Sequence, residues 1–246
     1  MIERLLRKLK SRDTISPEEE AALRGLIGAA EEVPAKTVLV ARGEPLRRSI
    51  LLVEGLMCRF RDLQSGRRQI SALHLPGDFP DLHGYTLRHL DQDVMTLAHC
   101  KVAFVPHERL DELTEAFPRL TRLLWFLTNL DAAMHREWEV SLGQRSGPAK
   151  AAHLFCELHA RLEMLGLTDG QAFALPISQT ELGECLGLTF VHTNRVLRTL
   201  RERGLADFRN RVVTIRDMEG LKALAEFDPT YLYLYLNLRR YPPQPE

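Results

Sequence analysis

Residues 178–197, with the sequence SQTELGECLGLTFVHTNRVL, constrain the fold of this chain more than any other stretch. Ser178 can cap the start of a helix, and Glu181 three residues later completes a capping box. Gly187 suits the left-handed conformation that ends a helix, and Thr189 can cap the helix that follows. The pattern predicts two short helices joined by a tight turn, which is the arrangement of a helix-turn-helix.

A basic segment follows this motif. From Thr189 to Arg216 the chain holds seven arginines and two acids, an excess of five positive charges, whereas the whole chain balances 33 basic against 33 acidic residues. Residues 208–211 and 212–215 are then typical of a short hairpin with its turn near Asn210. A helix-turn-helix followed by such a hairpin is a winged helix, whose second helix enters the major groove of double-stranded DNA while basic side chains meet the phosphates. The alternatives are another kind of helical hairpin and a solvated basic face.

Length and composition bound the rest of the chain. Its 246 residues allow one large domain or two ordinary ones, and 45% hydrophobic residues are enough for true cores. No apolar run approaches the ~20 residues of a membrane helix, and the start has no secretory signal, so we expect no membrane contact. The cysteines lack any CxxC spacing, which favours a reducing cytoplasm over a disulfide framework or a zinc site. They are Cys58, Cys100, Cys156 and Cys185.

Short strands are expected throughout residues 35–105. Turn signals separate apolar runs at 38–40, 49–53, 56–61, 69–75, 94–97 and 102–105. This close spacing predicts an antiparallel β-barrel or jelly roll. From Pro106 the hydrophobic period becomes that of helices, and we expect a long helix from Arg119 to about Leu142.

The long helix is expected to join two subunits. Its apolar side chains alternate in steps of three and four, as in a coiled-coil seam, at Leu120, Leu123, Leu127, Leu130 and Met134. A two-fold DNA site needs a two-fold protein, so we expect a homodimer. The alternative is a helix packed on its own barrel. The fold class is therefore α+β, with a sensor barrel at residues 1–117, the dimerisation helix and hinge at 118–146, and the winged helix-turn-helix at 147–246.

The order of these parts resembles the Crp/Fnr family of bacterial transcription regulators, over residues 15 to about 220. The resemblance is strongest in TELGECLGLTFVHTNRVLRTLRERGLADF, and the barrel contributes GEPLRRSILLVEGLMCRFR, SGRRQISALHLPGDF and CKVAFVPHERLDEL. The stretches VHTNR and AEFDPTYL are similar to a branch common in alphaproteobacteria. The resemblance implies a cyclic-nucleotide-binding-like barrel, a dimerising helix and a C-terminal winged helix. It also implies a transcription regulator that binds palindromic DNA as a homodimer, with RNA polymerase as a partner and an unidentified signal received in the barrel.

The resemblance places the base-reading positions on the second helix of the motif, at Val191, His192, Asn194 and Arg195. Arg195 matches the family's base-reading arginine, whose guanidinium can donate twice to guanine O6 and N7. Many members carry a glutamate at the position of Val191. A valine could contact only a thymine methyl, so we expect a changed half-site. Candidate phosphate contacts, which set register without reading sequence, are Ser178, Gln179, Thr180, Thr189 and Arg198.

The barrel departs from the family's cyclic-nucleotide pattern. After GDF at residues 77–79, the chain has PDLH where the second glycine and the ribose-binding glutamate would stand, and DQD at residues 91–93 near the place of the phosphate-binding arginine. Acidic groups would repel a phosphate, so we do not expect cAMP to bind. No other cofactor is expected either. An unidentified effector is expected between the barrel and the long helix, at Gly77, Asp78, Phe79, Leu82, His83 and Arg88.

Other chemistries leave weaker traces. Barrel histidines would suit haem or a metal ion, although loop and core histidines are the commoner outcome; they are His74, His83, His89 and His99. No cysteine precedes Cys58, which excludes the family's iron–sulfur cluster, and Cys58 or Cys100 could be a redox switch or a small core residue. No nucleophile–base pair, phosphate loop or HExxH motif indicates an enzyme. The remaining alternative is a small-ligand-binding module whose helix-turn-helix contacts protein.

Overall fold

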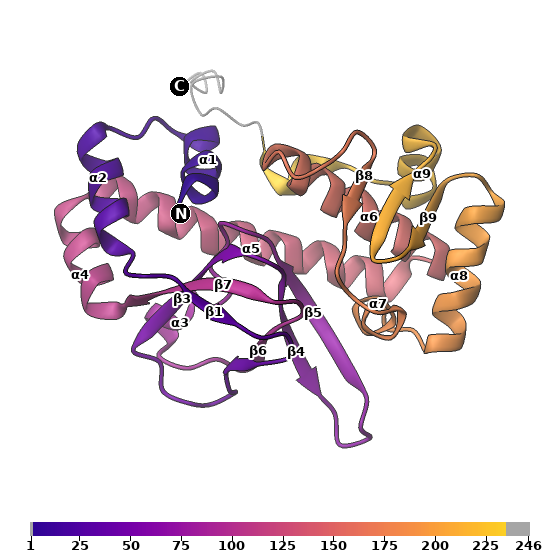
Figure 1. The fold of residues 1–246 in the computed structure, drawn as a ribbon, viewed down its shortest axis with the longest axis horizontal. Helices are drawn as coiled ribbons and strands as arrows, with labels where there is room; N and C mark the ends of the chain where they lie inside the picture. The colour runs from indigo at the N-terminus through magenta and orange to yellow at the C-terminus, as the bar shows by residue number, and fades with distance from the viewer. Residues whose placement is uncertain (1, 235–246) are drawn as a thin grey trace, which may run out of the picture.

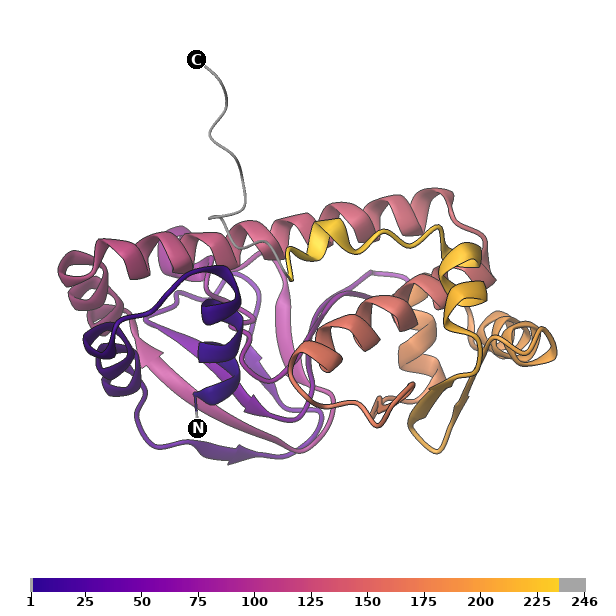
Figure 2. The ribbon, with the colours of Figure 1, turned by 90° about the horizontal axis from the view of Figure 1, so that it is seen from above.

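The α+β class is confirmed, with a β-rich half and a helical half lying along one long helix (Figure 1). The computed structural model describes residues 2–234. The long helix α5 (Pro118–Gln144) passes along both halves, and Figure 2 shows it at the upper edge of the molecule. Pro118 stands in its first turn, where the missing N–H would have had no intrahelical partner. The sequence predicted an end at about Leu142, and the helix ends two residues later, at Gln144.

Two antiparallel sheets form the barrel. One has the order β1-β7-β3, from β1 (Glu31–Val33), β7 (Cys100–Pro106) and β3 (Arg48–Glu54). The other has the order β2-β6-β4-β5, from β2 (Val38–Val40), β6 (Asp93–Thr96), β4 (Met57–Asp62) and β5 (Arg68–His74). The sequence predicted each of these strands except β1. Side chains such as Ile50, Leu52 and Val102 are buried between the sheets and hold them together.

Short helices cover the barrel. They are α1 (Glu3–Arg12), α2 (Pro17–Leu26), α3 (Gly84–Leu87) and α4 (His107–Ala116). Helix α1 packs directly on the loop that follows β5. A Cβ on Gly77, which has φ +88°, would lie 2.8 Å from backbone atoms of Arg4 and Leu5. Gly77 therefore serves the close approach of α1.

The helical half contains the predicted winged helix. Helix α6 (Gly147–Met164) leads through β8 (Ala172–Ala174) to α7 (Gln179–Leu186) and α8 (Phe190–Glu202). The wing strands β9 (Ala206–Arg209) and β10 (Val212–Ile215) follow, then α9 (Met218–Ala225) and the 3-10 turn η1 (Pro229–Leu232). The sheet order is β8-β10-β9, so the wing has a third strand that the sequence did not reveal. Residues 235–246 of the predicted third part lie outside the described residues.

One apolar core joins the two halves. It combines Cys58, Ile70 and Leu73 of the barrel with Leu158 of α6 and Leu186 of α7. Full burial of a large aliphatic side chain stabilises a fold by about 1.5–3 kcal/mol, so this shared core packs the halves firmly together. Within the described part of the chain, no helix is both long and apolar enough to cross a bilayer.

Asp81 gives the barrel a pH-dependent stability. It is fully buried, and its Oδ1 accepts a hydrogen bond from the Ile50 N–H at 2.8 Å. Burial raises the pKa of Asp81 from an ordinary value of 3.8 to about 7. As the pH rises from about 4 to 7, the unfolded chain ionises here while the folded chain keeps its proton. Folding therefore becomes less favourable, by up to roughly 1.4 kcal/mol per pH unit.

We expect Asp81→Asn, which cannot ionise, to remove this pH dependence. Between pH 4 and 7, the free energy of unfolding should fall further for the wild type than for the variant, by a difference on the order of 2–4 kcal/mol. Urea unfolding at each pH measures this difference. Above pH 7 the two curves should run parallel, and curves that are parallel over the whole range would show that Asp81 is ionised in the folded protein.

Candidate nucleic-acid interface

The helix-turn-helix forms with the caps that the sequence predicted. The Ser178 hydroxyl accepts a hydrogen bond from the Glu181 N–H at 3.2 Å, and the Glu181 carboxylate accepts one from the Ser178 N–H at 2.7 Å. Gly187 ends α7 with φ +65°. The Thr189 hydroxyl accepts from the His192 N–H at 3.3 Å and starts α8. These contacts satisfy donors that a helix start leaves open, and they fix the turn between the helices.

Helices α7 and α8 pack closely because Gly183 has no side chain. A Cβ on Gly183 would lie 2.7 Å from Thr193 Oγ1 and 2.8 Å from the Leu188 carbonyl oxygen. Thr193, Val196 and Leu200 form the buried side of α8. Since one side of α8 is held in this core, the opposite side is presented to solvent.

The exposed side of α8 carries three of the predicted DNA-contacting residues. Val191, Arg195 and Arg198 are all exposed, and their spacings of four and three place them on one side of the helix. His192 is also exposed. Asn194 differs, because it is half-buried and its amide donates to the backbone carbonyl four residues earlier, at 3.0 Å.

Phe190 is a further exposed residue of α8, which the sequence analysis did not single out. It is 55% exposed, and the adjacent Val191 is 59% exposed. The signal in the sequence was a pair of apolar residues directly after the cap at Thr189. Two exposed apolar side chains at the start of this helix suit contact with thymine methyl groups.

Four of the predicted phosphate contacts lie at the starts of the two helices, and the fifth, Arg198, lies in the second half of α8. Ser178, Thr180, Thr189 and Arg198 are exposed, whereas Gln179 is half-buried. Open N–H groups at a helix start favour a phosphate, because the helix dipole is positive there. Arg198 donates to the Glu202 carboxylate at 2.7 Å, so a phosphate would compete with this exposed ion pair.

The wing extends the basic surface beyond α8. Asn210 and Arg211 have φ of 51° and 61°, which is the two-residue turn that joins twisted antiparallel strands. The acid of this hairpin, Asp207, pairs with Arg209 at 3.0 Å and with Arg201 at 3.8 Å. Since one carboxylate stands against Arg201, Arg209 and Arg211, the surface around the wing keeps a net positive charge.

Two residues of the predicted seam on α5 are covered by the same protomer. Leu120 and Leu123 are 1% and 4% exposed, and they belong to the core formed with α1 and the barrel. Leu127, Leu130 and Met134 are half-buried and line a small cavity toward α1 and α6. The exposed side of α5 carries other residues, namely Arg122, Trp125, Asn129, Ala132, Arg136 and Val140. The more apolar stripe of the helix is therefore the one that faces its own protomer.

The residues expected to form an effector pocket have separate environments; they were Gly77, Asp78, Phe79, Leu82, His83 and Arg88. Phe79 and Leu82 are buried in the core that α1 and α5 share. Asp78 forms buried ion pairs, and Arg88 is exposed at the left-handed end of α3. His83 faces the space between the barrel and α5, where it meets an arginine that the sequence analysis missed.

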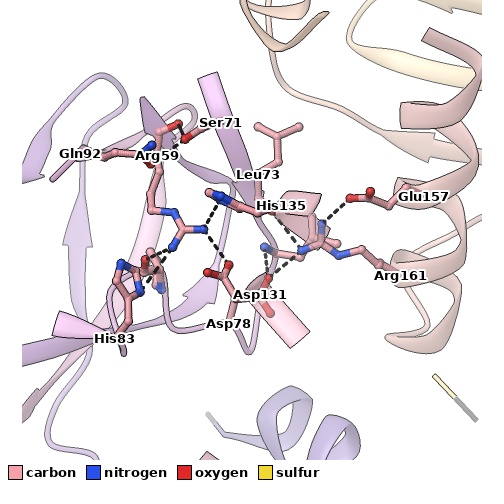
Figure 3. Close-up of polar contacts among 12 residues, drawn as sticks. Arg59, Ser71, Leu73, Asp78, His83, Gln92, Asp131, His135, Glu157 and Arg161 are labelled. Atoms are coloured by element: carbon pink, nitrogen blue, oxygen red, sulfur yellow. Dashed lines mark hydrogen bonds and ion pairs between the residues drawn. The ribbon is translucent and has the colours of Figure 1, made fainter. Parts of the chain in front are cut away.

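Arg59 on β4 fills part of this space (Figure 3), and its side chain is 3% exposed. Its Nη2 donates to Asp131 Oδ1 at 2.8 Å and to His135 Nε2 at 2.7 Å, both on α5. Its Nη1 lies 3.4 Å from the Pro80 carbonyl oxygen and 3.4 Å from His83 Nδ1, both on the loop after β5. The signal in the sequence was a charge inside the otherwise apolar run LMCRF.

Burial and the charge of Arg59 together decide the protonation of its neighbours. A guanidinium has only N–H donors, so His83 and His135 can accept from it only through an unprotonated ring nitrogen. Burial and the Arg59 charge lower the pKa of His83 to about 4, and they lower the pKa of His135 as well. Burial alone would raise the pKa of Asp131, but the Arg59 guanidinium holds it below its ordinary value. At neutral pH the cluster therefore contains one cation, one carboxylate and two neutral imidazoles.

A second buried arginine, Arg161, joins the barrel to α6 (Figure 3). It donates to the Leu73 carbonyl at 3.0 Å and to Asp78 Oδ2 at 3.1 Å, both in the barrel. It also donates to Glu157 on its own helix at 3.0 Å. Asp78 pairs in addition with Lys8 of α1. Burial alone would raise the pKa of Asp78, but Lys8 and Arg161 lower it to about 2, so the carboxylate stays ionised between two cations.

The cysteines and histidines of the described residues do not form a metal centre. Within residues 2–234, no three His, Cys, Asp or Glu side chains are arranged to hold a metal ion. All four cysteines are buried, and burial raises the pKa of Cys58 and Cys156 to about 12. These two cysteines are thiols at neutral pH and therefore poor nucleophiles.

Both halves match known protein families. Residues 30–117 match the cyclic nucleotide-binding domain, and residues 149–224 match the Crp-like helix-turn-helix domain. The transcriptional activator protein FnrA of Stutzerimonas stutzeri is 28% identical over 208 residues, which cover 79% of this chain and 85% of that protein. A probable transcriptional activator of Rhizobium leguminosarum bv. viciae is 29% identical over 196 residues, which cover 78% of this chain and 80% of that protein.

The fold is also found among solved structures. The structure of FixK2 from Bradyrhizobium japonicum superimposes with a TM-score of 0.73 at 24% identity, and the match covers 80% of this chain and 96% of that chain. The two matched domains lie on either side of the long helix α5. The chain belongs to the Crp/Fnr family of transcriptional regulators.

Proposed function

We propose that this regulator acts as a homodimer on a palindromic DNA site and has no catalytic activity. The observation that carries the proposal is the exposed side of α8, where Val191, Arg195 and Arg198 lie opposite a buried core. Two such helices related by a two-fold axis would enter successive major grooves, about 34 Å apart. Relatives named as transcriptional activators support activation of transcription, with RNA polymerase as a partner and the cytoplasm as the location.

We place the two-fold contact on the exposed side of α5. Trp125, Asn129, Ala132 and Arg136 follow one another in steps of four, three and four, which is heptad spacing. Trp125 is 68% exposed in the protomer. A large aromatic side chain is among the residues that contribute most to protein interfaces, so its exposure supports a partner on this side. An asparagine within such a seam favours one register between the two helices.

Arg195→Ala should relax the sequence preference at one base pair of each half-site. Loss of a bidentate guanine contact removes about 1–3 kcal/mol of discrimination. Arg198→Ala is the matched control, because an arginine that meets only phosphate should weaken all sequences about equally and reduce the salt slope by roughly one. Selection from random duplex DNA, followed by titration at several salt concentrations, measures both effects. If the wild type enriched no two-fold sequence, a ligand-binding module whose helix-turn-helix contacts protein would be favoured instead.

Val191→Glu should change the preferred base at a second position. A glutamate can accept from cytosine N4, whereas valine makes only an apolar contact with a thymine methyl. We expect the variant to gain roughly tenfold preference for cytosine at that position. Val191→Ala is the control, since it should weaken the thymine preference without creating one for cytosine. Identical selected sequences for all three proteins would show that residue 191 does not face a base.

Trp125→Glu should shift the equilibrium from dimer to protomer. The substitution removes the aromatic contact and places two carboxylates near the two-fold axis, so the dimer dissociation constant should rise more than about tenfold. Leu87→Glu is the control, because Leu87 is 58% exposed and belongs to α3, so the same charge is placed outside α5. Sedimentation equilibrium of both variants gives the constants. A dimer unaffected by Trp125→Glu would place the two-fold contact elsewhere.

A further inference from the structure

Arg59 connects the barrel strand β4 with the long helix α5, although the two elements share no backbone pairing. Its own position is set by β4, which pairs with β5 on one side and with β6 on the other. From this fixed base the side chain reaches α5, where it contacts Asp131 at 2.8 Å and His135 at 2.7 Å (Figure 3). The contacts with Pro80 and His83 of the barrel are longer, at 3.4 Å. The stronger contacts of the guanidinium are therefore those with the long helix.

These contacts favour one position of α5. A buried charge is stable only while its countercharge and its hydrogen-bond acceptors remain in place. The Arg59 side chain is 3% exposed, and Asp131 supplies a carboxylate directly on it. If α5 moved away from the barrel by a few ångströms, Arg59 would lose its contacts with Asp131 and His135 together. The arginine therefore links the conformation of the barrel to the position of the dimer helix.

The same strands also hold the DNA-binding half. In the register of β4 and β5, Arg59 stands opposite Ala72, and the next residue, Leu73, accepts a hydrogen bond from Arg161 of α6. Arg161 in turn pairs with Glu157, which accepts a hydrogen bond from Trp138 of α5 at 3.0 Å. A displacement of α5 would therefore disturb both the Arg59 cluster and the partner of Arg161.

We propose that the Arg59 side chain takes the place of an effector in the space between the barrel and α5. It supplies from within the chain the polar link between barrel and α5 that a regulator of this architecture could otherwise obtain from a bound small molecule. The chain then reaches its DNA-binding arrangement without an added ligand. This inference rests on the proposed DNA-binding function, and the experiments below separate the two.

The first experiment compares DNA affinities of purified proteins with no small molecule added, on the duplex enriched by selection. The wild type should bind in this condition. Arg59→Ala should bind at least about tenfold more weakly, because the apparent dissociation constant rises as the fraction of protein in the competent arrangement falls. Arg61→Ala is the matched control: Arg61 lies two residues further along β4, is exposed, and should leave the affinity unchanged.

Ethylguanidinium distinguishes a positioning role of Arg59 from a role in folding alone. It carries the group that Arg59→Ala removes and is small enough for the vacated space. At millimolar concentration it should restore DNA binding to Arg59→Ala and leave the wild type and Arg61→Ala unchanged, so that the variant becomes a ligand-dependent regulator. Thermal unfolding is followed in the same solutions. Recovery of thermal stability without recovery of DNA affinity would overturn the proposal.

Asp131→Asn gives the same test if Arg59→Ala does not fold. It keeps an oxygen acceptor for Arg59 but removes the countercharge, and it should weaken DNA binding several-fold. Glu115→Gln is its control, because Glu115 is an exposed carboxylate on α4, outside the long helix. Wild-type affinity in Arg59→Ala or Asp131→Asn would overturn the inference. So would a wild type that binds DNA only after an extract of small molecules is added. A wild type that binds no DNA in either condition would overturn the proposed function, and this inference with it.

Discussion

The fully buried carboxylate of Glu157 joins the long helix α5, helix α6 and the segment after α9. Its Oε2 accepts hydrogen bonds from Trp138 Nε1 at 3.0 Å and from the Tyr231 hydroxyl at 2.9 Å, and its Oε1 accepts from Arg161 at 3.0 Å. Leaving such a charge buried without partners costs about 3–5 kcal/mol. The long helix, the first helix of the DNA-binding half and the segment after α9 therefore stay together, and Arg161 extends the same network to Asp78 of the barrel.

Apolar packing and polar contacts have different roles at this junction. The core around Ile70 and Leu186 contributes most of the attraction between the halves, but apolar attraction has little directional preference. The guanidinium groups of Arg59 and Arg161 have fixed donor directions, so they specify how α5 and α6 are oriented on the barrel. This orientation requires a neutral His135, because a protonated imidazole could not accept a hydrogen bond from Arg59.

The range over which each constraint acts explains what could be predicted from the sequence. The caps and turn of residues 178–197 depend on neighbours within four positions, so local rules identified them correctly. Strand β8 has three residues and owes its existence to pairing with β10, far along the chain, so no alternation reveals it. Periodicity located an apolar stripe through Leu120 but could not show that the barrel of the same protomer covers it. Arg59 meets partners 72 and 76 positions away, and no local pattern reports such contacts.

The third strand of the wing determines how this regulator can change its DNA target. Strand β8 pairs with β10, and the Leu175 N–H donates to the carbonyl of Arg211 at the wing turn before the chain enters α7. These contacts fix the position of the wing relative to the helix-turn-helix. Because the wing and the helix-turn-helix are fixed to each other, a change of DNA target requires changed side chains on these two elements. For the dimer proposed above, variation in the spacing between half-sites would have to be accommodated where the two protomers meet.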